Sequence, residues 1–88
     1  MDKIVLLSLA SDLKRITLSI QRNSFSSAKR FNEEAKKWLL ESKKTSDKTV
    51  KELLRKVEIS LNQKDDLKKA EDLLMYSTLI QNKAISST

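Results

Sequence analysis

Apolar and small side chains recur every three or four residues over the first half of the chain. The series has ten steps and covers 36 residues, so its mean spacing is about 3.6 residues. That spacing is the period of a straight α-helix, and it predicts helical structure from about residue 2 to residue 43. The series consists of Leu6, Leu9, Leu13, Ile16, Ile20, Ser24, Ala28, Phe31, Ala35, Trp38 and Ser42.

The polar cluster at residues 21–24 decides how many helices this series contains. A single helix over the whole series would be far longer than the mean α-helix of about 11–12 residues. The cluster dilutes helix propensity, and either Asn23 or Ser24 could act as a helix cap there. We therefore favour two helices that break near residues 21–24, with one continuous helix as the alternative.

Another helix is predicted after a boundary at residues 45–47. This Thr-Ser-Asp segment offers N-cap side chains, and a capping box from Thr49 to Glu52 is the alternative start. Asp47 and Lys51 are four residues apart, a spacing at which opposite charges stabilise a helix. The apolar stripe of this helix consists of Val50, Leu53, Leu54, Val57 and Leu61.

The last predicted helix follows a turn at residues 62–64 and extends to about Ala84. Asp65 and Asp66 place negative charge in its first turn, where the helix dipole favours it. Its apolar stripe consists of Leu67, Ala70, Leu73, Leu74, Ile80, Ala84 and Ile85.

The composition supports a fold built of helices alone. The chain has 88 residues with no Gly and no Pro, where average usage would supply roughly six and four. A multi-stranded sheet would then lack the usual residues of its tight turns, whereas Asn can replace Gly at a helix C-terminus. We predict one all-α domain over residues 1–88. It is a small antiparallel helical bundle with four helices, or three if residues 2–43 form one long helix.

Apolar side chains also occur outside these stripes on the first and last helices. At about 100° per residue, Ile4, Leu7 and Leu18 lie away from the first stripe, and Met75 and Leu79 add a second apolar side to the last helix. Three arrangements would cover them: the middle of a compact four-helix monomer, a symmetric homodimer, or a groove for another protein's helix. Because a domain of this size has a small core, homodimerisation through these five residues is the leading interpretation.

The sequence offers no candidate for catalysis. His and Cys are absent, which removes the usual general base near neutral pH and the thiolate nucleophile. Adjacent acidic pairs such as Glu33 and Glu34 point about 100° apart on a helix, so they do not converge on one atom. Phosphate-cradling loops need glycine. We therefore expect a non-enzymatic protein without catalytic, cofactor, metal or small-molecule sites.

Positive charge is concentrated in the first half of the chain. The net charge is +6, and residues 1–44 hold ten Lys or Arg against five Asp or Glu, a balance of +5. On a continuous helix, five basic side chains would form a ridge opposite the apolar stripe, and such a ridge could bind phosphates. The ridge consists of Lys14, Arg15, Arg22, Lys29 and Arg30. A solubilising outer face explains the same ridge, since no recognition-helix motif or interleaved aromatic pattern accompanies it.

The start of the chain does not indicate a membrane or export segment. The apolar run from Ile4 to Ala10 is too short to span a bilayer, and residues 1–3 are not the basic start of a signal peptide. We expect a cytoplasmic protein that does not bind membranes. No motif identifies a family. The sequence favours a small helical interaction or assembly protein that forms a homodimer, with sequence-independent nucleic-acid binding as the alternative.

Overall fold

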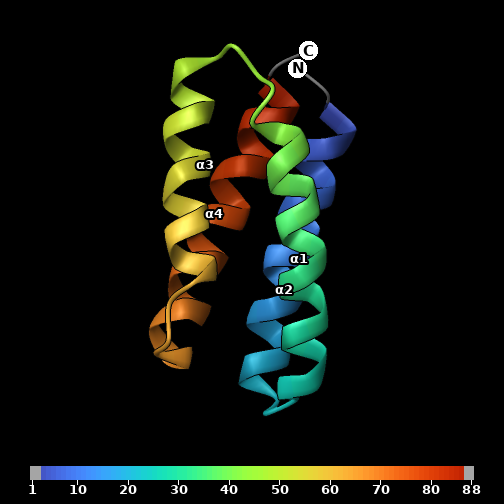
Figure 1. Cartoon of the computed structure of the whole chain (residues 1–88), viewed down its shortest axis with the longest axis vertical. Helices are drawn as coiled ribbons and strands as arrows, with labels where there is room; N and C mark the ends of the chain where they lie inside the picture. Colours follow the sequence, from blue (N-terminus) through green and yellow to red (C-terminus); the bar gives the residue numbers. More distant parts are fainter. Residues whose placement is uncertain (1–2, 87–88) are drawn as a thin grey trace.

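The protein folds into four α-helices joined by short turns. The computed structural model describes residues 3–86, which form α1 (Lys3–Gln21), α2 (Phe25–Ser42), α3 (Lys48–Leu61) and α4 (Asp66–Ser86). Successive helices run in opposite directions along a bundle with Cα extents of 36 × 19 × 19 Å (Figure 1). The predicted all-α antiparallel bundle is confirmed in its four-helix form.

The break between α1 and α2 is made by Asn23. Its φ of 58° lies in the left-handed region, where Asn is tolerated better than most side chains. The N–H of Ser24 donates to the carbonyl of Ser19 (2.8 Å), and the N–H of Asn23 donates to that of Ile20 (3.0 Å). This pair of bonds is a Schellman motif. Ser24 precedes α2 but its side chain makes no capping hydrogen bond, so the break is set by how α1 ends.

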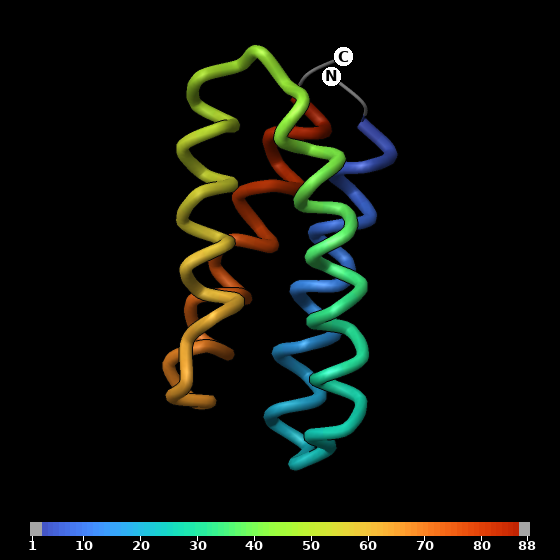
Figure 2. The backbone as a smooth tube through the Cα atoms, in the orientation of Figure 1, coloured from blue at the N-terminus to red at the C-terminus, as the bar shows by residue number. Residues whose placement is uncertain are grey.

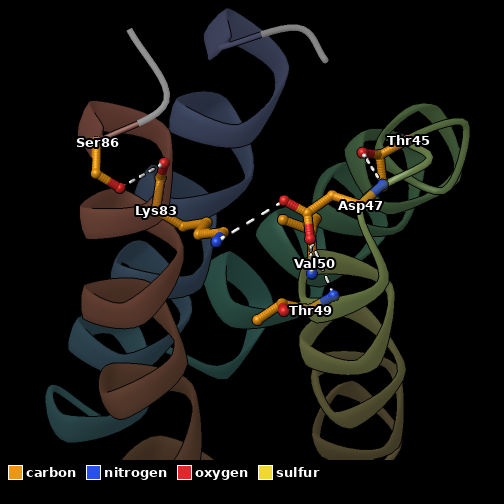
Figure 3. Close-up of polar contacts among 6 residues, drawn as sticks. All are labelled: Thr45, Asp47, Thr49, Val50, Lys83 and Ser86. Carbon is orange, nitrogen blue, oxygen red and sulfur yellow. Dashed lines mark hydrogen bonds and ion pairs between the residues drawn. The ribbon is translucent and has the colours of Figure 1, made fainter.

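Asp47 caps the N-terminus of α3. Its Oδ1 accepts hydrogen bonds from the N–H of Thr49 (2.9 Å) and of Val50 (3.2 Å), and Lys83 Nζ of α4 lies 3.8 Å from its Oδ2 (Figure 3). The Val50 bond is the main cause that holds the pKa of Asp47 below 3.8, and the charge of Lys83 also lowers it. The carboxylate therefore ties α3 to α4, instead of pairing with Lys51 as the sequence suggested.

Asp65 caps α4 in the same manner. Its Oδ1 accepts from the N–H groups of Leu67 (3.1 Å) and Lys68 (3.2 Å). Asp65 thus stands just before the helix, and Asp66 is the acidic residue of the first turn. Both acids lie at the positive end of the helix dipole, as their order in the sequence predicts.

The core is built from one stripe of each helix. Phe31, Trp38 and Leu53 pack against its edge, half-buried. The predicted stripe of α1 is buried in full, and that of α3 is buried except for Leu53. In α2 the prediction was wrong in part, because Leu39 is buried in the core while Phe31 and Trp38 lie at its edge. The stripe of α4 is narrower than predicted. The core side chains are Leu6, Leu9, Ala10, Leu13, Ile16, Ile20, Ala28, Ala35, Leu39, Val50, Leu54, Val57, Leu61, Ala70, Leu73, Ile80 and Ala84.

Hydroxyl groups fix the register between α1 and α4. Thr17 Oγ1 donates to the carbonyl of Ala70 (3.1 Å), and Ser77 Oγ donates to the carbonyl of Ala10 (2.8 Å). All four residues are buried. Residue 10 therefore lies beside residue 77, and residue 17 beside residue 70, because the two helices are antiparallel.

The four helices are arranged as a ring of neighbours. α1 packs closely on both α4 and α2, α3 packs on α4, and the contact between α2 and α3 is the slightest of the four. The tube in Figure 2 shows α2 and α3 well apart along their lengths and joined by a loop at one end. The side formed by α1 and α4 is consequently opposite the side formed by α2 and α3.

Candidate interaction surfaces

Ten large apolar side chains of residues 3–86 are exposed, and seven of them belong to α1 and α4. Leu67, Leu74 and Ile85 were predicted to be core residues, but 78%, 43% and 53% of their surfaces are exposed. The prediction was wrong because α4 meets its neighbours through a narrow stripe. The exposed side chains are Ile4, Leu18, Phe25, Leu40, Ile59, Leu67, Leu74, Met75, Leu79 and Ile85.

Leu67 and Leu74, which were wrongly predicted to be core residues, lie on the side of α4 that is next to α1. Ala70 and Ser77 both bond to α1, so they mark the line along which α4 faces that helix. Leu74 is four residues after Ala70, and Leu67 is three residues before it. At about 100° per residue, both lie beside this line on its solvent side. Ile85 occupies the same row near the end of α4.

A corresponding row of side chains lies on α1, beside its contact with α4. Ala10 and Thr17 mark that line of contact. At about 100° per residue, Leu7, Lys14 and Leu18 lie beside the line on its solvent side. Leu7 is half-buried, and Leu18 is 39% exposed. Together the two rows form what we call the α1–α4 face, made of Leu7, Leu18, Leu67, Leu74 and Ile85.

The structure does not bring together all five predicted interface residues. Lys83 contacts α3 through Asp47, and Leu79 is one turn before Lys83, so Leu79 leans toward α3. Met75 points outward from α4 at the edge of the α1–α4 face, and Ile4 lies farther round α1 toward α2. Four of the five side chains are exposed, Leu7 being the exception. The folded chain alone therefore leaves these four side chains exposed, whereas the compact-monomer alternative requires them to be buried.

The five basic residues do not form one ridge, because α2 turns back along α1 at Asn23. All five are exposed, but Lys14 belongs to the α1–α4 face. Lys29 is seven and fourteen residues before Lys36 and Lys43, and these three share the α3 side of α2. The expected ridge of Lys14, Arg15, Arg22, Lys29 and Arg30 is thus divided among different sides of the bundle.

Arg15 and Arg30 meet at the seam of α1 and α2. Their guanidinium carbons lie 5.7 and 5.0 Å from the centre of the Phe31 ring. Such cation–π contacts hold arginine side chains against the protein. Phe31 was predicted to be a core residue, and it instead packs at the core edge beneath two cations.

Asp12 is a buried acid that the sequence prediction missed. Only 1% of its surface is exposed; Oδ1 accepts a bond from Arg15 Nη1 (3.1 Å), while Oδ2 has no hydrogen-bond partner among residues 3–86. Burial and the nearby charge of Glu34 raise its pKa above 3.8, against the lowering effects of Arg15 and the Trp38 indole. The signal was its position four residues before Ile16, beside the apolar stripe of the first helix.

Several other acids make surface ion pairs. Lys68 Nζ lies 3.7 Å from Asp72, as the spacing predicts, and Glu33 pairs with Lys36 (3.6 Å).

Within residues 3–86, no three acidic side chains gather closely enough to hold a metal ion. No helix in the same range is both long and apolar enough to cross a membrane.

Comparison with known proteins yields no match: no family model, no curated protein and no solved structure is similar to this chain. The functional argument accordingly rests on the surfaces described above.

Proposed function

We propose that the protein is a self-associating helical module, and that the α1–α4 face joins two copies in a symmetric homodimer. The observation that carries this proposal is the row of Leu67, Leu74 and Ile85, which are all exposed on α4. By the register of the two helices, Leu18 of α1 lies beside Leu67 at one end of this row. Single exposed apolar residues are ordinary on protein surfaces, but a continuous apolar patch marks an interaction site. A two-fold axis would let the same patch pair with itself.

One whole side of the bundle is large enough to form a dimer interface. One long side of the bundle measures 36 × 19 Å between Cα atoms, on the order of 700 Å². Specific protein interfaces bury about 800 Å² on each partner once side chains are counted. One side of the molecule therefore supplies the area that self-association needs.

The charges on this face also favour a second copy of the chain. The molecule carries +6 overall, so two copies repel each other unless the excess lies elsewhere. By register, Lys14 of α1 and Glu71 of α4 fall on the α1–α4 face, close to the level of Leu74. The middle of the face thus carries one cation and one anion, and a symmetric partner presents the same balanced pair.

Leu74→Glu tests the proposal, with Leu79→Glu as its matched control. The two leucines are on the same helix and are 43% and 45% exposed, so each substitution costs the fold a similar amount. Light scattering should give about twice the 10.1 kDa chain mass for the wild type and for Leu79→Glu, and the monomer mass for Leu74→Glu. Circular dichroism should show full helicity in all three.

Two results would overturn the homodimer. One is a wild-type chain that stays monomeric as its concentration rises through the micromolar range. The other is dissociation by Leu79→Glu and not by Leu74→Glu, which would move the contact to the α3 side of α4.

Nucleic-acid binding is the second candidate, and a smaller set of residues supports it than the sequence suggested. Arg15 and Arg30 converge on Phe31, and Arg22 is exposed at the end of the same helix as Arg15. Three arginines at one seam could contact phosphates with strong salt dependence. Arg15 is already paired with Asp12, however, which lowers the charge this cluster offers.

A further inference from the structure

The side of the bundle opposite the α1–α4 face carries a groove. Two adjoining hollows, of about 620 and 310 Å³, lie between α2 and α3 and share Lys43, Glu58 and Asn62 in their linings. The groove exists because α2 and α3 pack on each other least of all the neighbouring helices. We call this feature the α2–α3 groove.

The groove has an apolar floor and apolar walls. Leu39 and Leu61 line it from below and are nearly fully buried in the core. Leu40 of α2 and Ile59 of α3 also line it, yet 67% and 66% of their surfaces are exposed. These two side chains come from different helices and reach water on the same side of the molecule. Burying both on a partner would remove apolar surface from water.

The rim of the groove is basic. Lys36 and Lys43 stand on α2, and Lys51 and Arg55 stand on α3, against the single acid Glu58. Glu58 pairs with Lys43 across the groove. Within residues 3–86, Lys51 and Arg55 have no ion-pair partner. The rim therefore has an excess of positive charge beside the groove.

We propose that the α2–α3 groove binds an acidic amphipathic α-helix of another protein. The apolar face of such a helix would cover Leu40 and Ile59, and its acidic flanks would meet Lys51 and Arg55, in the helix-in-groove mode of peptide recognition. α3 has 14 residues, so at 1.5 Å per residue it can support about four turns of a bound helix.

An acidic helix fits the groove better than a nucleic acid does. Proteins that bind single-stranded nucleic acid without sequence preference stack the bases on aromatic side chains. None of the residues that line the groove is aromatic. Phe31 lies on the α1 side of α2, beneath Arg15 and Arg30. The aliphatic walls and the acid Glu58 would also contribute nothing to phosphate binding.

The test measures binding of a labelled designed peptide by fluorescence anisotropy. The probe is a helical peptide of about 18 residues with Leu at i, i+3, i+4 and i+7 spacing and Glu on its flanks. Control probes replace Glu by Lys, replace Leu by Ser, or substitute a single-stranded oligonucleotide. The acidic amphipathic peptide should bind, and each peptide control should bind at least tenfold more weakly.

Substitutions in the protein locate the binding. Ile59→Ser and Arg55→Glu should each weaken the acidic peptide at least tenfold. Leu67→Ser, at an even more exposed leucine on the opposite side, should leave its affinity unchanged. Leu74→Glu should also leave it unchanged, because the groove does not depend on the proposed dimer.

Three outcomes overturn the proposal: no binding of the acidic peptide by wild-type protein, undiminished affinity in Ile59→Ser, or tighter binding of the oligonucleotide than of the peptide. Loss of affinity in Leu67→Ser as large as that in Ile59→Ser would likewise place the contact elsewhere. None of these results depends on whether the chain dimerises, so the two proposals stand or fall separately.

Discussion

Asp12→Asn should make the protein more stable at neutral pH. The carboxylate of Asp12 is 1% exposed, and only one of its two oxygens has a hydrogen-bond partner within residues 3–86. Burial and the charge of Glu34 both raise its pKa, which means that the fold disfavours the charged form. An amide of the same shape keeps an acceptor for Arg15 and removes the negative charge.

Two opposing contributions set the size of the effect. A buried polar atom without a partner costs about 1–3 kcal/mol, and more when the group is charged. The ion pair with Arg15 offsets this only in part, because the guanidinium side chain is 54% exposed, and such pairs contribute about 0–1 kcal/mol. The unpaired amide nitrogen of Asn retains part of the penalty. We therefore expect a gain of about 1 kcal/mol in the free energy of unfolding.

The gain should depend on pH in a defined direction. Because the folded-state pKa of Asp12 lies above 3.8, the protonated carboxyl's contribution to stability is complete below pH 3.8 and is lost as the pH rises through the folded-state pKa. The advantage of Asn should be full at pH 7 and nearly absent below pH 3.8. Urea unfolding of both proteins at a series of pH values measures it.

Asp72→Asn serves as the control for this experiment. Asp72 makes a surface ion pair with Lys68, so its replacement should change stability by a few tenths of a kcal/mol at most. The reasoning fails if Asp12→Asn destabilises the protein at pH 7. It fails equally if the gain is the same at pH 3 as at pH 7, because the charge would then not be its cause.

Two further substitutions test how the helices begin and end. Asp47→Ala should lower the melting temperature at pH 7, and the difference should shrink in acid. The pKa of Asp47 is lowered, so the stability contributed by its charge is present above pH 3.8 and is lost as the pH falls through the folded-state pKa. Thermal unfolding followed by circular dichroism checks this, and a constant difference down to pH 2 would contradict it. Asn23→Ala should cost about 1 kcal/mol because Ala disfavours the positive φ, whereas Asn23→Gly should be neutral or stabilising. Urea unfolding that ranks Ala above Gly would refute the left-handed assignment.

The sequence predicted the core of α1 in full and that of α3 except for Leu53, and the reason is geometric. Leu9, Leu13 and Ile16 follow the helical period, and α1 is covered by neighbours on both sides of that stripe, so one apolar direction was enough. α4 carries apolar side chains in more than one direction. Only its register against α1, fixed by the bonds of Thr17 and Ser77, decides that Leu73 is buried and Leu74 is exposed.

The basic ridge was predicted wrongly for a different reason. That prediction assumes a continuous helix, although a break near residues 21–24 is the favoured interpretation of the same segment. Once Asn23 turns the chain, Lys29 joins the α3 side of α2, and Arg30 meets Arg15 over Phe31. The α2–α3 groove could not be predicted from the sequence either. Leu40 and Ile59 each look like isolated exposed residues until the two helices are placed side by side.

The positions of the two proposed surfaces have a consequence for binding strength. The α1–α4 face and the α2–α3 groove lie on opposite sides of a bundle 19 Å wide, so a dimer through the first would carry its two grooves on its outer sides. An acidic partner with two helical segments could then occupy both, if its linker spans the dimer, and gain avidity without new contacts. A monomeric Leu74→Glu variant would keep the single-groove affinity and lose only the avidity. Comparing one-helix and two-helix probes on wild type and on this variant therefore separates the groove's own affinity from what dimerisation adds.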